Sequence, residues 1–222
     1  MQPLELYIHI PFCVKKCAYC DFLSGPAGEK EKEEYVKMLV DEIRNCPDTV
    51  QNYRVISIFF GGGTPSLLTG EQIGRLMDTV REIFTLDEDA EITMEMNPGT
   101  VTEEKLRRYR QAGVNRLSIG LQSVNDEELR LLGRIHTYEE FREAYHLARA
   151  NGFSNINVDL ISAIPGQTVE SWRRTLEQVM ALSPEHISAY SLSLEEGTPF
   201  YKKYVEDEAK EGPKLPDEDA ER

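Results

Sequence analysis

Three cysteines within eight residues give this 222-residue chain its clearest capacity for chemistry. Cys13, Cys17 and Cys20 form a C-x3-C-x2-C pattern directly after a short apolar segment. Such a tight loop can bring three thiolates to a single metal centre, and thiolates are the usual ligands of iron–sulfur clusters. A cluster of four irons with three cysteine ligands keeps one iron open for an exchangeable ligand. Lys15 and Lys16, inside the loop, would offset the negative charge of the cluster.

A zinc ion is the alternative occupant of the cysteine loop. Structural zinc sites have four ligands, so three cysteines would need a further donor, which His9 could supply. Tyr7 and Tyr19 flank the loop and could contact its ligand or pack in the core. Cys46 follows a predicted helix and precedes Pro47, where we interpret it as a small half-buried side chain. The sequence shows neither a membrane span nor a secretory signal, so we predict a cytoplasmic protein, and in that reducing compartment clustered cysteines favour metal binding over disulfides.

A run of glycines forms a second motif, Gly61-Gly62-Gly63-Thr64-Pro65, between an apolar strand-like run and a predicted helix. Glycines let the backbone approach a ligand closely and expose its N–H groups. The pattern is neither G-x-G-x-x-G nor a Walker A loop, since no lysine follows, and this disfavours nucleoside triphosphates. Taken alone, the motif could be a tight turn. Its position one β/α unit after the cysteine loop favours a ligand-binding loop.

Two carboxylates, Glu95 and Asp159, lie within the apolar strand-like segments EITMEMNP and INVDLISAIPG. A carboxylate in such a setting needs a partner, and a ribose or an amino group of a ligand would serve. Gln122 and Arg134 are further polar candidates. Taken singly, polar residues of these types are more often solvated or satisfied within the structure.

The four histidines divide into two pairs. His9 and His136 lie at predicted loop edges near the site and could ligate a metal or a heme. His146 lies on an amphipathic helix and His186 opens a strand, so we interpret both as structural or surface residues.

The elements that must position these residues alternate regularly. Apolar patterning predicts strands over about 4–10, 55–60, 90–96, 115–120, 155–160 and 186–193. It predicts helices over about 29–46, 70–84, 102–112, 137–152 and 168–182, with a short helix after 125. Helix-start spacings are Thr69 with Gln72, Asn125 with Glu128 and Thr137 with Glu140, and Gly113 is a helix stop. Because helical crossovers separate the strands, they pair in parallel, which defines an α/β protein.

Two architectures fit this alternation, an open doubly wound sheet and an incomplete (β/α) barrel. Both place their sites at the carboxyl ends of the strands. Nearly every predicted strand here ends in polar or glycine-rich sequence: His9, Gly61–Thr64, Glu95, Gln122, Asp159 and Ser193. Because six strand ends converge on one place at a barrel mouth, we predict a partial (β/α)6 barrel.

The composition excludes several partners. With 39 acidic and 25 basic residues the net charge is −14, which disfavours binding to nucleic acid or to anionic lipid. No apolar run is long enough for a membrane span, and the N-terminus lacks a secretory signal pattern. Residues 195–222 contain ten acidic and five basic residues. We therefore expect a core over 1–194, and over 195–222 the start of an acidic C-terminal segment whose remainder is missing.

The motifs taken together resemble those of a known family. They are YIHIPFCVKKCAYCDF, FFGGGTPS, EMNPGTV, RLSIGLQS, LGRIHT, NVDLISAIPGQT and AYSLSLEEGTPF. Their combination and order, over about residues 3–205, resemble the radical S-adenosylmethionine superfamily. More narrowly, they are similar to its HemN/HemW branch of oxygen-independent coproporphyrinogen III oxidases and heme chaperones. The resemblance implies a partial β/α barrel of six strands, in agreement with the six predicted units.

The resemblance also implies cofactors and ligand contacts. It implies a [4Fe–4S] cluster on Cys13, Cys17 and Cys20, with S-adenosylmethionine chelating the open iron through its amino and carboxylate groups. An electron donor would reduce the cluster, and cleavage of S-adenosylmethionine would give a 5′-deoxyadenosyl radical. The cofactor-contact positions carried over are Tyr7, Tyr19, Gly62, Gly63, Thr64, Glu95, Gln122, Arg134, Asp159 and Ser193. Some of these serve a second S-adenosylmethionine in the oxidases.

Two departures select within the branch. The oxidases have a further cysteine two residues beyond the third, where this chain has Phe22, and they carry a longer segment before their cysteines. Both differences resemble the heme chaperones, as does the segment LGRIH. The expected function is therefore to bind heme and transfer it to an acceptor protein. The alternatives are oxidative decarboxylation of coproporphyrinogen III in porphyrin biosynthesis and a zinc-stabilised α/β domain without redox chemistry.

Overall fold

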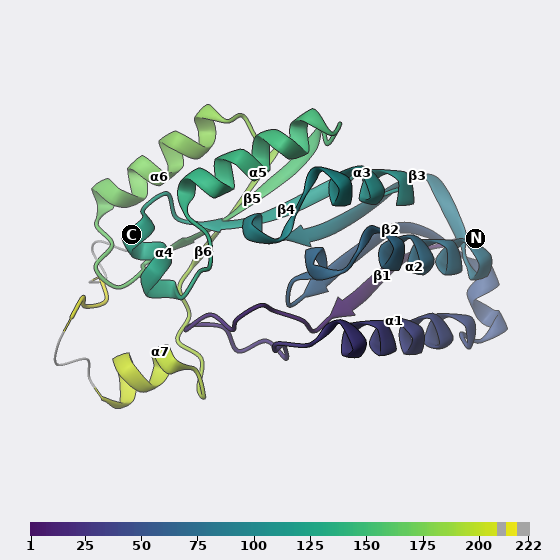
Figure 1. Cartoon of the computed structure of the whole chain (residues 1–222), viewed down its shortest axis with the longest axis horizontal. Coiled ribbons are helices and arrows are strands. Elements are labelled where there is room, and N and C mark those ends of the chain that lie inside the picture. The colour runs from purple at the N-terminus through teal and green to yellow at the C-terminus, as the bar shows by residue number, and fades with distance from the viewer. Residues whose placement is uncertain (208–211, 217–222) are drawn as a thin grey trace.

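Six parallel strands form one sheet in which the spatial order is the sequence order. The computed structural model describes residues 1–207 and 212–216. The strands are β1 (Gln2–Ile10), β2 (Tyr53–Gly62), β3 (Thr85–Met96), β4 (Arg116–Gln122), β5 (Asn155–Ser162) and β6 (His186–Ser191). Each strand pairs in parallel with the next, and the sheet curls into a half-barrel (Figure 1). The predicted partial (β/α)6 barrel is confirmed.

Helices cover the outer face of this sheet (Figure 1). They are α1 (Glu29–Arg44), α2 (Gly70–Ile83), α3 (Glu103–Ala112), α4 (Asp126–Leu132), α5 (Tyr138–Ala150), α6 (Val169–Ala181) and the single turn α7 (Pro199–Tyr201). Short 3-10 turns follow β2 at Pro65–Leu67 and β3 at Pro98–Thr100. Reciprocal caps form at Thr69 with Gln72 and at Thr137 with Glu140, as predicted, because each pair satisfies N–H groups at the helix start.

The hydrophobic core lies between the sheet and these helices. Val55, Ile58 and Phe60 of β2 are almost fully buried, as are Ile73 and Leu76 of α2. Burying each such side chain stabilises the fold by about 1.5–3 kcal/mol. Because the outward faces of the strands supply this core, the residues that point inward are free to be polar.

The chain after β6 returns to the barrel. Phe200 and Tyr204 are buried against a small apolar cluster that includes Ile161 and Ile164. The backbone N–H of Phe200 donates to the carbonyl of Ala18 at 3.0 Å, which ties this segment to the cysteine loop. A division at 194/195 stays a prediction, and residues 208–211 and 217–222 of the acidic tail lie outside the described residues. None of the described helices is both long and apolar enough to cross a membrane.

Candidate metal and cofactor site

A cavity of about 480 Å3 opens at the carboxyl ends of the strands. This volume lies within the ordinary range for small-molecule sites. Its lining includes neither His9 nor His136. It does include all three predicted cluster cysteines and every predicted cofactor contact except Tyr7: Cys13, Cys17, Tyr19, Cys20, Gly62, Gly63, Thr64, Glu95, Gln122, Arg134, Asp159 and Ser193. The Tyr7 hydroxyl instead lies 3.1 Å from Nδ1 of His9, and the Tyr7 side chain is largely exposed. The barrel mouth therefore gathers residues that are far apart in the sequence.

The cysteine loop is held by backbone hydrogen bonds. The N–H of Cys13 donates to the carbonyl of Gly25 at 2.9 Å, and the N–H of Ala18 donates to that of Leu132 at 3.0 Å. None of the four cysteines forms a disulfide. Because the backbone fixes the loop, the three thiols face the cavity without making the contacts that hold the chain in place.

Two polar side chains contact the thiols. Thr64 Oγ1 lies 3.7 Å from Cys13 Sγ, and Arg134 Nη1 lies 3.8 Å from Cys17 Sγ. Burial raises the pKa of the Cys20 thiol, and the neighbouring Cys17 thiol raises it further. A guanidinium beside these sulfurs would stabilise thiolates and the negative charge of a bound cluster.

The donor set fits an iron–sulfur cluster. Within residues 1–207 and 212–216, no three His, Cys, Asp or Glu side chains converge closely enough to bind a single metal ion. A cubane cluster makes a different demand, because each cysteine binds a separate iron. The three cysteines of one short loop all line the cavity, and the Arg134 guanidinium lies beside Cys17, an arrangement that suits such a cluster.

The glycine loop lies directly against the cysteine loop. Gly62 has a φ of +114°, and a Cβ at this position would overlap the ring of His9. A Cβ on Gly63 would come within 2.6 Å of the carbonyl of Phe12. Only glycine fits at both positions, so the backbone itself forms this part of the cavity wall.

Two buried carboxylates face the cavity in different environments. Glu95 accepts a hydrogen bond from the N–H of Gly62 at 3.0 Å, and burial raises its pKa to about 7. Asp159 accepts hydrogen bonds from Ser118 Oγ and Asn157 Nδ2, each at 2.8 Å. Burial also raises the pKa of Asp159, and these hydrogen bonds oppose the rise. The cavity therefore holds one carboxylate that titrates near neutral pH and one that is more fully hydrogen-bonded.

The segment after α4 braces the end of β4. Arg134 Nη2 donates to the carbonyl of Gly120 at 2.6 Å, and His136 Nε2 lies 3.3 Å from the carbonyl of Leu121. Burial lowers the pKa of His136 to about 3, so its ring is neutral and packs inside the fold. Arg134 Nε is buried without a hydrogen-bond partner among the described residues.

Comparison with known proteins decides the family. The sequence matches the Radical SAM superfamily over residues 7–179, which is most of the chain. This chain belongs to the radical SAM superfamily. Membership of this family implies a [4Fe–4S] cluster and S-adenosylmethionine. The three thiols, the glycine loop and the Arg134 guanidinium beside Cys17 fit those groups.

Within the radical SAM superfamily, the chain is similar to proteins of known name. It is 45% identical to the heme chaperone HemW of Escherichia coli K12, over 99% of this chain and 56% of that protein. It is 38% identical to the heme chaperone HemW of Bacillus subtilis, over 88% of this chain and 52% of that protein. The solved structure of E. coli coproporphyrinogen III oxidase (HemN) matches with a TM-score of 0.87 and 34% identity, covering 99% of this chain and 50% of that one. The chain thus spans about half the length of these relatives.

Several residues of the radical SAM cavity were not predicted from the sequence. Ser118 and Gly120 line it together with Gln122, at alternate positions of β4. Tyr190 of β6 and Leu192 also line the cavity. The two-residue period of a strand could have identified Ser118 and Gly120 if the predicted strand over 115–120 had been extended to Gln122, which lies two residues beyond it.

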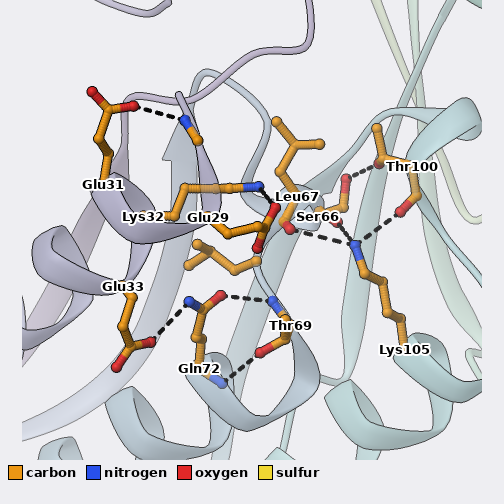
Figure 2. Close-up of polar contacts among 12 residues, drawn as sticks. Glu29, Glu31, Lys32, Glu33, Ser66, Leu67, Thr69, Gln72, Thr100 and Lys105 are labelled. Carbon is orange, nitrogen blue, oxygen red and sulfur yellow. Dashed lines mark hydrogen bonds and ion pairs between the residues drawn. The ribbon is translucent and has the colours of Figure 1, made fainter. Parts of the chain in front are cut away.

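Lys105 of α3 lies behind the glycine loop. Its ammonium group donates to the carbonyls of Ser66, Leu67 and Thr100 at 2.8, 3.4 and 3.1 Å (Figure 2). Burial and the nearby Lys32 lower the pKa of this ammonium group. Ser66 in turn lies 2.6 Å from Thr100 Oγ1, so one cation ties the segments after β2 and β3 together.

Proposed function

We propose that this chain is the radical SAM part of a cytoplasmic heme chaperone, which binds a [4Fe–4S] cluster and S-adenosylmethionine and transfers heme to an acceptor protein. The observation that carries the proposal is 45% identity with the E. coli heme chaperone HemW over 99% of the chain. Phe22 supports it, since this residue stands where the oxidases have a further cysteine. Because the chain covers 56% of that relative, the proposed activity is one of the whole protein.

In this proposal Cys13, Cys17 and Cys20 hold the cluster, which supplies electrons from a donor protein. The glycine loop lets S-adenosylmethionine approach the backbone closely, because Gly62 and Gly63 carry no side chains, and Glu95 accepts a hydrogen bond from its amino group. The remaining proposed cofactor contacts are Tyr7, Tyr19, Gly62, Gly63, Thr64, Gln122, Arg134, Asp159 and Ser193. The cytoplasm is the proposed compartment, because cluster thiols must stay reduced.

A second candidate is the oxygen-independent coproporphyrinogen III oxidase activity. It is favoured by the match to the solved E. coli oxidase, with a TM-score of 0.87 at 34% identity. This activity would oxidatively decarboxylate a porphyrinogen and consume S-adenosylmethionine. The two candidates share the cluster site, so a test must follow the tetrapyrrole.

The test uses full-length protein reconstituted anaerobically with iron and sulfide. Heme is titrated into one sample, and coproporphyrinogen III with S-adenosylmethionine and a reductant is supplied to another. We expect stoichiometric heme binding, transfer to an apo-acceptor, and no decarboxylated product. Failure to bind heme would contradict the chaperone proposal, and release of 5′-deoxyadenosine with decarboxylated product would favour the oxidase.

A further inference from the structure

A buried carboxylate behind the cavity has no role in the site described so far. Glu128 of α4 is 6% exposed, and its carboxylate accepts hydrogen bonds from four neutral side chains. Ser123 Oγ and Gln167 Nε2 donate to Oε2 at 2.6 and 2.9 Å. Ser171 Oγ and Asn125 Nδ2 contact Oε1, the latter at 3.5 Å. In the described part of the chain Glu128 forms no ion pair, so neutral donors alone stabilise this charge.

The donors come from two different loops at the barrel mouth. Ser123 directly follows Gln122, at the end of β4. Gln167 belongs to the loop between β5 and α6, and Gln167 Nε2 also lies 3.5 Å from the carbonyl of Ile161. Gln122 and Ile161 both line the cavity. Glu128 thus joins the loop after β4 to the loop after β5.

Both of these loops contain a strained backbone. Gln122 has a φ of +76° and Ala163 a φ of +58°, and Ser183 is the only other non-glycine residue with positive φ among the described residues. A left-handed conformation costs free energy for a residue with a side chain and persists only where the surroundings hold it. Gln122 adjoins Ser123, and Ala163 lies between Ile161 and Gln167. The hydrogen bonds of Glu128 therefore reach residues close to both strained positions: Ser123 beside Gln122, and Gln167 in the loop that contains Ala163.

Helix capping does not account for this carboxylate. The spacing of Asn125 and Glu128 predicts a reciprocal cap, but the N–H of Asn125 donates to Ser123 Oγ at 3.0 Å instead. The Asn125 side chain caps the N–H of Glu127 at 2.9 Å. Asp126 and Glu127 already place negative charge in the first turn of α4 while remaining exposed. Burial of a third acid is therefore unnecessary for the helix.

We propose that Glu128 is a positioning residue, whose carboxylate holds Gln122 and the loop after β5 in the conformations that bind S-adenosylmethionine. This inference rests on the proposed function for its ligand. It assigns no direct contact between Glu128 and the cofactor. The loops and their strain are properties of the chain itself, so they can be tested without the cofactor.

The first measurement is amide hydrogen exchange of the cofactor-free full-length protein, comparing wild type with Glu128→Gln. The glutamine amide keeps one acceptor oxygen and replaces the other by an N–H donor. The Asn125 amide nitrogen cannot accept from that donor and the Ser171 hydroxyl must reorient to do so, so the network loses its charge and at least one hydrogen bond. We expect roughly tenfold faster exchange at 120–124 and 162–168, with α1 and α2 unchanged. Equal exchange in both proteins would overturn the proposal, whatever the protein binds.

The second measurement is S-adenosylmethionine binding to the reconstituted protein, followed by the change in the electron paramagnetic resonance spectrum of the reduced cluster. Glu128→Gln should keep its iron content and bind S-adenosylmethionine roughly tenfold more weakly. Glu127→Gln, an exposed neighbour, is the matched control and should bind as wild type does. A Glu128→Gln protein with unchanged affinity would overturn the positioning role, whereas a wild type without any spectral change would contradict the proposed function instead.

Two further variants separate positioning from general stability. Glu128→Gln with Gln167→Glu restores a carboxylate–amide pair at the same place, and we expect it to recover part of the affinity. If Glu128→Gln does not fold, Ser123→Ala removes one donor and leaves the carboxylate with the other three. Faster exchange confined to 120–124 in this variant would support the proposal, and a uniform increase over the whole barrel would refute it.

Discussion

The two halves of the barrel mouth are braced by ions of opposite charge, a half-buried lysine and a buried glutamate. We call the segments after β2 and β3 the lysine side, where the Lys105 ammonium donates to three backbone carbonyls. We call the loops after β4 and β5 the glutamate side, where the Glu128 carboxylate accepts from four neutral side chains. Neither ion forms an ion pair within the described residues. These loops have no hydrogen bonds of a β-sheet to order them, and on each side one charged side chain joins two of them.

The two sides differ in what the ion must hold. On the lysine side the backbone is relaxed, because glycine occupies the position at Gly62 that needs a positive φ. On the glutamate side the positive φ values fall on Gln122 and Ala163, which have side chains. The glutamate side therefore needs a brace to keep its shape, whereas the lysine side needs one mainly to satisfy buried carbonyls.

The largest effect is expected from a variant that removes the proposed iron–sulfur cluster, which would lie between the two sides. Cys13 contacts Thr64 on the lysine side, and Cys17 contacts Arg134 beside the glutamate side. Cys17→Ser should abolish the cluster completely, measured by iron and sulfide content. The free energy of unfolding should change by less than about 1 kcal/mol, because the loop lies outside the core.

Cys46→Ser is the matched control for that variant, because Cys46 is the cysteine outside the cavity lining. It should keep the full iron content. If Cys17→Ser unfolded the cofactor-free protein, the cysteine loop would be needed for folding. It would then not serve only to hold a cluster between two independently braced sides.

The next effect is a pH dependence that comes from Glu95. Its folded-state pKa of about 7 lies above the ordinary value of 4.5, because of burial and the nearby Asp159. Between these two values the folded state binds more protons than the unfolded state, so stability falls as the pH rises. The loss should reach about 3 kcal/mol by the time the pH exceeds 7.

Denaturant unfolding of the cofactor-free protein between pH 5 and 8 would measure this loss, with Glu95→Gln as the control that removes it. A Glu95→Gln protein with the same pH slope as wild type would show that another group titrates. A ligand amino group beside Glu95 would favour its charged form, so S-adenosylmethionine should bind more tightly as the pH rises through 7.

A third variant, Lys105→Met, tests the lysine side alone. It removes the ammonium donor from all three carbonyls, of which only that of Ser66 keeps a second side-chain donor, the Tyr109 hydroxyl at 3.2 Å. This should lower the free energy of unfolding by about 1–3 kcal/mol. Methionine retains the length and apolar stem of lysine, so packing is largely preserved. Lys30→Met, at an exposed position of α1, should leave the unfolding free energy within about 0.5 kcal/mol.

Neither brace was predicted from the sequence, although most of the fold was. The six β/α units and the cysteine and glycine loops depend on local patterns, which sequence periodicity reports directly. Lys105 and Glu128 are ordinary residues for the first turns of helices, and Glu128 has the spacing of a cap. Their burial depends on Ser66 and Gln167, which lie 39 residues away from them in both cases.

The sequence pattern also failed to predict the first residues of β3, and the reason is physical. The strand begins at Thr85, but the segment TLDEDAE lacks the apolar alternation that predicted a strand only from residue 90. Thr85 and Leu86 pair with Arg54 and Val55 of β2, so the neighbouring strand imposes the extended conformation. Pairing of this kind overrides local preference and cannot be inferred from the segment itself.

The smallest expected effect compares two serines that occupy equivalent places. Ser66 and Ser123 are both fully buried, and each hydroxyl accepts a backbone N–H, from Asn97 at 3.1 Å and from Asn125 at 3.0 Å. They differ in one contact, since Ser66 pairs with the Thr100 hydroxyl and Ser123 donates to the Glu128 carboxylate. Hydrogen bonds to charged groups are the stronger kind.

Ser66→Ala should therefore lower the free energy of unfolding by about 1 kcal/mol and Ser123→Ala by about 2 kcal/mol. Both substitutions delete a hydroxyl and leave one backbone N–H without its acceptor. The difference between the two losses of unfolding free energy therefore reports the contribution of the hydrogen bond to the Glu128 carboxylate. Denaturant unfolding of both variants under one condition measures it. A larger loss for Ser66→Ala would mean that the lysine side is the more tightly braced half, which reverses the comparison. The predicted order follows if the hydrogen bond from Ser123 to the Glu128 carboxylate, a buried charge without a counter-ion, stabilises the fold more than the hydrogen bond between the Ser66 and Thr100 hydroxyls.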